Sequence, residues 1–286
     1  MSQTIISSGE VSSGLVADYS NTIIVSGGTA VDTTIDYGAM SVFIAGARVS
    51  NTVMSGGILY ASAGQIENTT MDDGAVFSAL YSVDITGTTV NSGGSGVFRA
   101  SSVKDTIVNS GGRIDIYGGT VTNTTVNQGS MSLANSNAAA YNTFITGSGY
   151  YTVLQVQNSA TITGTTVESS AYLRLSYGAV ANDTILNRGG NLIVSNGATA
   201  ANTTINEGGS MSIEGGNADL VTVNSGGWLS AGYSYNGATT PPPPRGSRKM
   251  AARSTSDPAP HTITSMIPPR APMSTITPTS TIPSNS

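Results

Sequence analysis

The stretch from Asp105 to Leu133 reads DTIVNSGGRIDIYGGTVTNTTVNQGSMSL and contains nearly the same phrase twice. DTIVNSGG begins at Asp105, and NTTVNQGS begins 18 residues later. The same pattern extends along the chain on both sides of this stretch: a small residue follows an apolar residue three positions later. The apolar residues are Ile35, Val53, Met71, Val90, Val108, Val126, Ile145, Val167, Leu186, Ile205 and Val223. The steps are 18 or 19 residues, except one of 22 after Ile145. A near-constant period of this size is typical of solenoids.

Each repeat has two halves, as in TVNSGGSGVF (89–98) and GGTVTNT (118–124). Both alternate apolar and polar residues with the period of a strand, and their glycines supply turns. Like residues of successive coils then stack about 4.8 Å apart. We therefore predict an all-β parallel β-helix (β-solenoid) of about twelve 18–19-residue coils, each burying its face on the next.

Stacking predicts ladders of equivalent side chains. The apolar anchors from Val90 to Val223 should form an inward ladder, with Ile114 buried as well. A threonine ladder two positions earlier should hydrogen-bond along the rod axis, through Thr69, Thr88, Thr106, Thr124, Thr143, Thr165, Thr184 and Thr203. Asparagines that bond their own backbone should occupy turns, at Asn51, Asn68, Asn123, Asn142, Asn182 and Asn202.

Composition divides the chain at about residue 240. All eleven prolines lie in 241–286, while 34 of the 35 glycines precede them. Residues 1–240 carry 15 acids and 6 bases (net −9), and 241–286 carry 1 acid and 5 bases (net +4). We predict a repeat domain over 1–240 and a disordered Pro/Ser/Thr-rich basic tail over 241–286, which obstructs the last coil without pairing with it.

Residues for catalysis or for metal binding are sparse. There is no cysteine, and the only histidine, His261, lies in the tail. Asp72 and Asp73 are interpreted as turn residues, Asp32 and Asp36 as strand-flanking carboxylates, and Arg99, Arg113 and Asp115 as a surface ion-pair group on neighbouring coils. N-x-T triplets at Asn68, Asn123, Asn182 and Asn202 are interpreted as turns. We expect no catalytic, cofactor or metal site, and no cofactor.

The repeats DTIVNSGGRIDIYGGTVTNTTVNQGS, GATAANTTINEGGSMSIEGG and VTVNSGGWL closely resemble the strand-loop-strand repeats of AIDA-type autotransporter adhesin passengers. The resemblance covers most of residues 20–235. It implies a right-handed β-helix at the bacterial cell surface, a non-enzymatic stalk or adhesin acting in cell adhesion, self-association or biofilm formation. Implied partners are other copies of the chain or host and surface glycans and proteins. Some family members carry O-linked heptose, which makes exposed Ser and Thr candidate acceptors.

The net charge and the sequence pattern limit which other functions are compatible with this chain. A net charge of −5 argues against nucleic-acid binding. No run is apolar for long enough to span a membrane as a helix, and no signal peptide is visible at the N-terminus, although the expected location is extracellular or on the cell surface.

Two alternative functions remain. A carbohydrate-active β-helix enzyme requires clustered acids or bases. An ice-binding solenoid requires a flat, regular T-x-T face. An outward row of Tyr and Phe could stack on sugar rings, from the set Phe43, Tyr60, Phe77, Tyr81, Phe98, Tyr117, Tyr141, Tyr150, Tyr151, Tyr172 and Tyr177.

Overall fold

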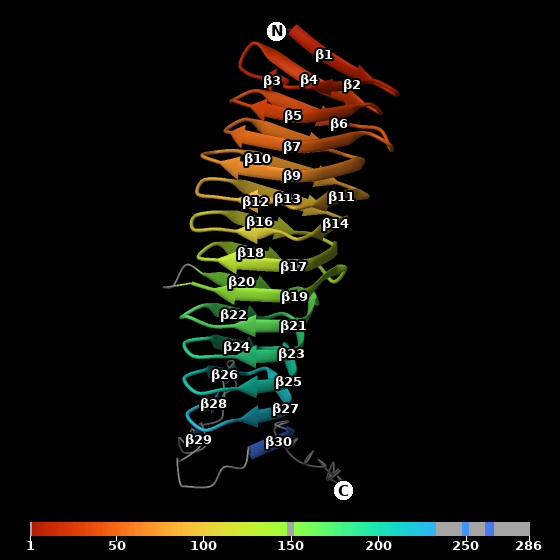
Figure 1. The fold of residues 1–286 in the computed structure, drawn as a ribbon. Coiled ribbons are helices and arrows are strands. Elements are labelled where there is room, and N and C mark those ends of the chain that lie inside the picture. Colours follow the sequence, from red (N-terminus) through yellow and green to blue (C-terminus); the bar gives the residue numbers. More distant parts are fainter. Residues whose placement is uncertain (1, 148–151, 233–247, 252–260, 266–286) are drawn as a thin grey trace, which may run out of the picture.

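The chain folds into a rod of stacked β-coils (Figure 1). The computed structural model describes residues 2–147, 152–232, 248–251 and 261–265, and every regular element in these ranges is a strand. Within them, no helix is long and apolar enough to cross a membrane. Two sheets run along the rod, and strands of successive coils pair in parallel within each sheet. The prediction of an all-β parallel solenoid of about twelve coils is confirmed.

The first sheet, sheet A, takes one strand from each coil. Its strands are β1 (Ser2–Ser7), β4 (Asn21–Ser26), β6 (Ala39–Val42), β8 (Ile58–Ala61), β10 (Val76–Leu80), β13 (Ser95–Arg99), β16 (Arg113–Ile116), β18 (Ser130–Leu133), β20 (Val153–Val156), β22 (Tyr172–Leu175), β24 (Asn191–Ser195), β26 (Ser210–Glu214), β28 (Trp228–Gly232) and β29 (Arg248–Ala251).

The second sheet, sheet B, holds longer strands, several of which are split in two. Its strands are β2 (Val11–Ser13), β3 (Val16–Ala17), β5 (Thr29–Ile35), β7 (Arg48–Ser55), β9 (Gly64–Asp72), β11 (Val83–Thr86), β12 (Thr89–Val90), β14 (Ser101–Lys104), β15 (Ile107–Val108), β17 (Gly119–Asn127), β19 (Ala138–Thr146), β21 (Thr161–Val167), β23 (Val180–Leu186), β25 (Thr199–Ile205), β27 (Asn217–Val223) and β30 (His261–Ser265).

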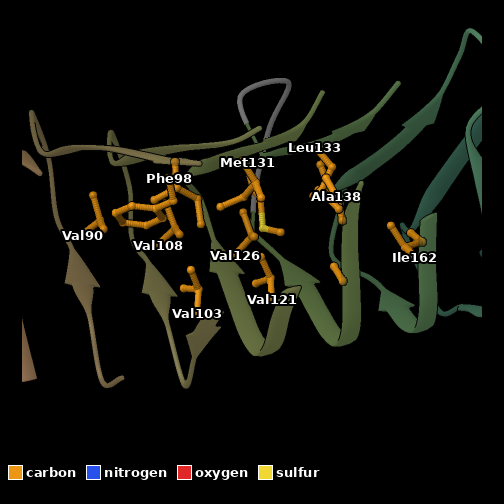
Figure 2. Close-up of a cluster of buried hydrophobic side chains, with 14 of the residues drawn as sticks. Val90, Phe98, Val103, Val108, Val121, Val126, Met131, Leu133, Ala138 and Ile162 are labelled. Atoms are coloured by element: carbon orange, nitrogen blue, oxygen red, sulfur yellow. The ribbon is translucent and has the colours of Figure 1, made fainter. Parts of the chain in front are cut away.

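Side chains between the two sheets form one continuous hydrophobic core. The predicted ladder from Val90 to Val223 is buried at every position, as is Ile114. Figure 2 shows Val90, Val108 and Val126 following one another along the axis, with Phe98 and Met131 filling the space beside them. Because each apolar side chain rests on its equivalent in the next coil, burial extends along the rod without a central globular core.

One repeat anchor, Val53, does not point inward. Val53 is 46% exposed, and Met54 is the buried residue, paired with Ile35 and Met71 of the neighbouring coils. Both residues precede a glycine by three positions in VMSGG, so the motif alone does not distinguish them. A shift of one residue moves a side chain to the opposite face of a strand, and pairing with the adjacent coils decides in favour of Met54.

The two consecutive glycines of the repeat are required for different reasons. Gly111 has a φ of +74°, which favours glycine, and it forms the turn that follows the sheet B strand. Gly112 has an ordinary φ, but a Cβ there would lie 2.4 Å from the carbonyl oxygen of Val90 in the preceding coil. The second glycine is therefore required because the coils approach closely at this corner.

Two short segments of the tail pair with the last coil. β29 is antiparallel to β28, and β30 is antiparallel to β27. The prediction that the tail does not pair with this edge is wrong for these nine residues, which contain no proline and so can offer their N–H groups. The remainder of 241–286 lies outside the described residues, and for it disorder stays a prediction, as does the domain boundary at 240.

Candidate functional surface

A ladder of left-handed residues forms a corner in sheet B, once per coil from β5 to β27. Each precedes a buried threonine, or Val221 in the last coil, and has a φ between +52° and +70°. The extra residue changes the strand parity: in β17, Val121, Thr124 and Val126 all point inward although the first two lie three positions apart. We call this set the corner ladder; it comprises Asp32, Asn51, Asn68, Gly87, Asp105, Asn123, Asn142, Gly164, Asp183, Asn202 and Leu220.

The corner asparagines bond one another, whereas the sequence predicted bonds to their own backbone. Asn68 Nδ2 donates to Asn51 Oδ1 at 3.2 Å, and Asn51 Nδ2 donates to Asp32 Oδ1 at 2.9 Å. Asn142, Asn123 and Asn202 repeat the pattern in later coils. The prediction for Asn182 is wrong, because Asp183 is the left-handed residue there. The usable signal in the sequence was the Asn, Asp or Gly directly before each ladder threonine.

A second amide ladder lies at the turn that follows sheet B, and we call it the turn ladder. Asn109 Nδ2 donates to Asn91 Oδ1 at 2.8 Å, and Asn91 Nδ2 donates to Asp72 Oδ1 at 2.7 Å. Further along the rod, Asn224 donates to Asn206, Asn206 to Asn187, and Asn187 to Glu168. Stacked amides of this kind also stabilise cross-β structures.

The buried threonine ladder is present, but it does not form the predicted hydrogen bonds along the axis. Thr69, Thr88, Thr106, Thr124, Thr143, Thr165, Thr184 and Thr203 are all buried, and Thr33 and Thr52 extend the row. Their Oγ1 atoms have no hydrogen-bond partner among the described residues. The methyl groups thus account for the favourable packing, and each hydroxyl is buried at a cost.

The residue after each threonine of the buried ladder points outward, as does Thr222 after Val221, and these residues form an uncharged stripe along the rod. Consecutive members are paired across the strands, as in Thr166 with Phe144 and with Ile185. We call this set the outward stripe; it comprises Thr34, Val53, Thr70, Thr89, Ile107, Thr125, Phe144, Thr166, Ile185, Thr204 and Thr222. The N-T-T triplets therefore place one threonine inside and the next one outside.

This geometry does not supply the regular T-x-T face that ice binding requires. The half-strand that carries the outward stripe has a single outward residue between two buried ones, as in β25. In the other half, Thr120 and Thr122 of β17 are outward, but Ala139 and Tyr141 occupy the same rows of β19. Across the described coils, outward threonines thus do not form a flat two-row array.

The carboxylates considered for catalysis hold structural positions. Asp32 and Asp72 begin amide ladders, Asp36 follows the end of β5, and Asp73 is a turn residue with a φ of +33°. In the described ranges, no three or more His, Cys, Asp or Glu side chains are grouped so that they could hold a metal ion. The exposed Asp18 caps a local turn. Hydrogen bonds that the Ser20 hydroxyl and, to a smaller extent, the Ser20 backbone N–H donate to its carboxylate lower the pKa of Asp18.

The predicted arginine–aspartate group forms within one strand and not between coils. Arg113 Nε and Nη2 donate to the two oxygens of Asp115, two residues further along β16, at 2.8 and 3.0 Å. These hydrogen bonds and the negative charge of Asp115 raise the pKa of Arg113. Arg99 lies over the ring of Tyr117, 5.2 Å from its centroid. The group is an ordinary ion pair with a neighbouring cation–π contact.

The aromatic side chains form pairs and not a continuous outward row within the described coils. Phe77 and Phe98 are buried, with ring centroids 5.1 Å apart. Tyr19 and Tyr37 stack at 5.3 Å, and Phe43 lies 6.1 Å from Tyr60. Tyr150 and Tyr151 fall in a segment that the structure does not describe.

Comparison with known proteins agrees with this architecture. A family model described as "Adhesin of bacterial autotransporter system, probable stalk" matches residues 177–227. A crystal structure of the TibC-catalysed, hyper-glycosylated TibA fragment 55–350 aligns with a TM-score of 0.69 at 26% identity, covering 82% of this chain and 92% of that one.

A crystal structure of PfbA, a surface adhesin of Streptococcus pneumoniae, aligns with a TM-score of only 0.23 at 10% identity, over 81% of this chain and 79% of that chain. No curated protein sequence matches the chain. The family-model match over residues 177–227 and the alignment with the TibA fragment support the resemblance to AIDA-type autotransporter adhesin passengers that the repeat pattern indicated.

Proposed function

We propose that this chain is a non-enzymatic adhesive rod of the bacterial cell surface, which acts in adhesion between cells or to surfaces and in biofilm formation. The observation that carries the proposal is the combination of AIDA-type repeats with a solenoid over which the TibA fragment aligns. A stack of near-identical coils presents the same side-chain rows many times. Weak contacts along such rows add up through multivalency.

Surface display tests this proposal. The chain is fused to a heterologous outer-membrane anchor in a non-adherent bacterium, with the anchor alone as the control. We expect cells that carry the chain to sediment faster and to leave more biofilm than control cells. Equal sedimentation and equal biofilm, at matched surface expression, contradict an adhesive role.

We further propose that outward hydroxyls of this rod accept sugars. The aligned TibA fragment is itself hyper-glycosylated, which supports the idea. In the N-T-T triplets at Asn123 and Asn202, Thr124 and Thr203 are buried, so only Thr125 and Thr204 can reach a transferase. After co-expression with TibC, mass spectrometry should find sugar on the second threonine and not on the first. Modification of the first threonine, or of neither, contradicts the assignment.

A further inference from the structure

The two amide ladders fix many asparagine side chains of the rod, but Asn196 belongs to neither. It lies in the turn between β24 and β25, on the edge where the chain passes from sheet A to sheet B. The Ala198 N–H closes this turn by donating a hydrogen bond to the Ser195 carbonyl oxygen at 3.0 Å. Asn196 is exposed, and its side-chain amide has no hydrogen-bond partner among the described residues.

The residue after Asn196 leaves its backbone nitrogen accessible. Gly197 has no side chain, and its N–H donates no hydrogen bond within the described coils. Its φ of +77° lies in the left-handed region that favours glycine. An added Cβ would meet only the Gly178 nitrogen, at 3.5 Å, so the surroundings of this peptide group are open. The amide of Asn196 is therefore free to turn towards the Gly197 nitrogen, and water can reach both.

Four other asparagines of the described coils have no side-chain hydrogen bond, but the peptide nitrogen that follows each of them is less accessible. They are Asn127, Asn137, Asn182 and Asn217. After Asn127 and Asn137 the next N–H donates to a carbonyl oxygen. Asn182 and Asn217 lie within the strands β23 and β27, and each of the four precedes a residue with a side chain. Among these coils, only Asn196 combines a free amide with a free glycine nitrogen.

We infer that Asn196 is a site of spontaneous deamidation, a reaction to which asparagine is prone as a thermolabile residue. The Gly197 nitrogen loses its proton and attacks Cγ of Asn196. An N–Cγ bond forms, the Cγ–Nδ2 bond breaks, and ammonia leaves with that proton. Water then opens the resulting five-membered imide. Opening at Cγ gives aspartate, and opening at the backbone carbonyl carbon gives isoaspartate, in which the chain runs through the side chain. Either route consumes one water, releases one ammonia and leaves one new carboxylate.

The ladders protect the other asparagines, because the imide can close only if the side-chain amide turns back to the next backbone nitrogen. Asn109 Nδ2 donates to Asn91 Oδ1 at 2.8 Å, and Asn206 Nδ2 donates to Asn187 Oδ1 at 2.9 Å. These hydrogen bonds join neighbouring coils and must break before either amide can turn. Conversion in the described coils is therefore concentrated at Asn196. It adds a negative charge to one edge of the rod as the protein ages, independently of the proposed function.

Peptide mapping of the full chain tests the inference. Purified protein is incubated at neutral and at mildly acidic pH, then denatured and cut after glutamate in mild acid, which releases residues 169–207. This peptide holds Asn196 together with the ladder residues Asn187, Asn202 and Asn206, so each sample contains its own reference. We expect tandem mass spectrometry to find progressive loss of Asn196 at neutral pH, slower loss in acid, and intact ladder asparagines. Isoaspartate among the products identifies the imide route, because direct hydrolysis of the amide gives only aspartate.

Two variants separate the effect of the glycine from that of the free amide, and circular dichroism checks that both keep the fold. Gly197→Ala adds a methyl group beside the attacking nitrogen and should slow the loss of Asn196. Ser110→Gly places a glycine after Asn109, whose amide is held in the turn ladder, so Asn109 should stay intact.

Three outcomes overturn the inference. The first is an Asn196 that converts no faster than the ladder asparagines of the same peptide. The second is aspartate without isoaspartate, which excludes the imide route. The third is an Asn109 that converts as fast as Asn196 in the Ser110→Gly variant, which would show that the ladder gives no protection and that the free amide does not select the site.

Discussion

Asn123 donates a hydrogen bond from its side-chain amide to the carboxylate of Asp105, one coil earlier, at 3.0 Å. Every run of both amide ladders begins in this way. Counted from the N-terminal end, the first member of each run is an acid, and the members that follow are asparagines: the acids are Asp32, Asp105 and Asp183 at the corner, and Asp72 and Glu168 at the turn. All the amides donate towards the N-terminal end, so the first member needs only an acceptor, which a carboxylate supplies.

The corner ladder thereby shows a longer repeat of four coils. Gly14 occupies the same row one coil before Asp32, and like Gly87 and Gly164 it has a positive φ. In this row, each of the three glycines is followed one coil later by an acid. The order along the rod is Gly-Asp-Asn-Asn, then the same again, then Gly-Asp-Asn-Leu. The last group departs from the pattern at Leu220, which is 45% exposed and has a φ of +52°.

Leu220→Asn should stabilise the rod. A leucine in the left-handed region costs about 1–2 kcal/mol, and asparagine tolerates that conformation better. The new amide can also donate to Asn202 Oδ1, since the two positions are in register. We expect the free energy of unfolding to rise by about 1 kcal/mol, measured by chemical denaturation. Leu220→Ala is the control, and an asparagine variant no more stable than the alanine variant contradicts the account.

Thr143→Val should stabilise the rod. The Thr143 hydroxyl is buried and has no partner in the described coils, and valine has the same shape without the polar group. The last coil already places Val221 in this row, opposite Thr203. Removing the unpaired hydroxyl should raise the free energy of unfolding by about 1–2 kcal/mol. Thr143→Ser, which keeps the hydroxyl and loses the methyl, should lower it; the opposite order would mean that the hydroxyl is hydrogen-bonded.

Gly96 and Phe98 compensate for each other's size. A Cβ on Gly96 would lie 2.8 Å from Phe98 Cζ, so the phenyl ring occupies the space of the missing side chain. Gly96→Ile alone should destabilise the rod by overpacking, by about 1–3 kcal/mol. Combined with Phe98→Ile, it reproduces the Ile114 and Ile116 pair of the next coil. A double-mutant cycle should show favourable coupling of at least about 1 kcal/mol, and additive effects would refute the compensation.

Met54 and Val53 test the register of β7. Met54→Ser removes a buried side chain and should cost about 2–5 kcal/mol. Val53→Ser changes an outward residue and should alter the free energy of unfolding by no more than about 0.5 kcal/mol. Thermal and chemical denaturation of both variants measure these changes in the free energy of unfolding. A larger loss for Val53→Ser would place Val53 in the core.

Repetition in the amino-acid sequence was enough to predict the solenoid, its period and most of its core. A coil can bury its apolar face only on another copy of itself, so the fold requires a repeating sequence, and a repeat can be recognised in the chain alone. The inward positions of Val108, Val126 and Leu186 followed from this argument, as did the corner and turn character of most asparagines. The resemblance to AIDA-type passengers was recognised from the same repeats.

The three-dimensional arrangement was needed for every feature that depends on which residue of one coil meets which residue of the next. Val53 and Met54 both satisfy the local motif, and only pairing with Ile35 and Met71 separates them. The amide ladders and the unpaired threonine hydroxyls likewise arise between residues 17 to 19 positions apart along the chain. Contacts of this kind are set by the stacking of coils, and no local sequence pattern contains them.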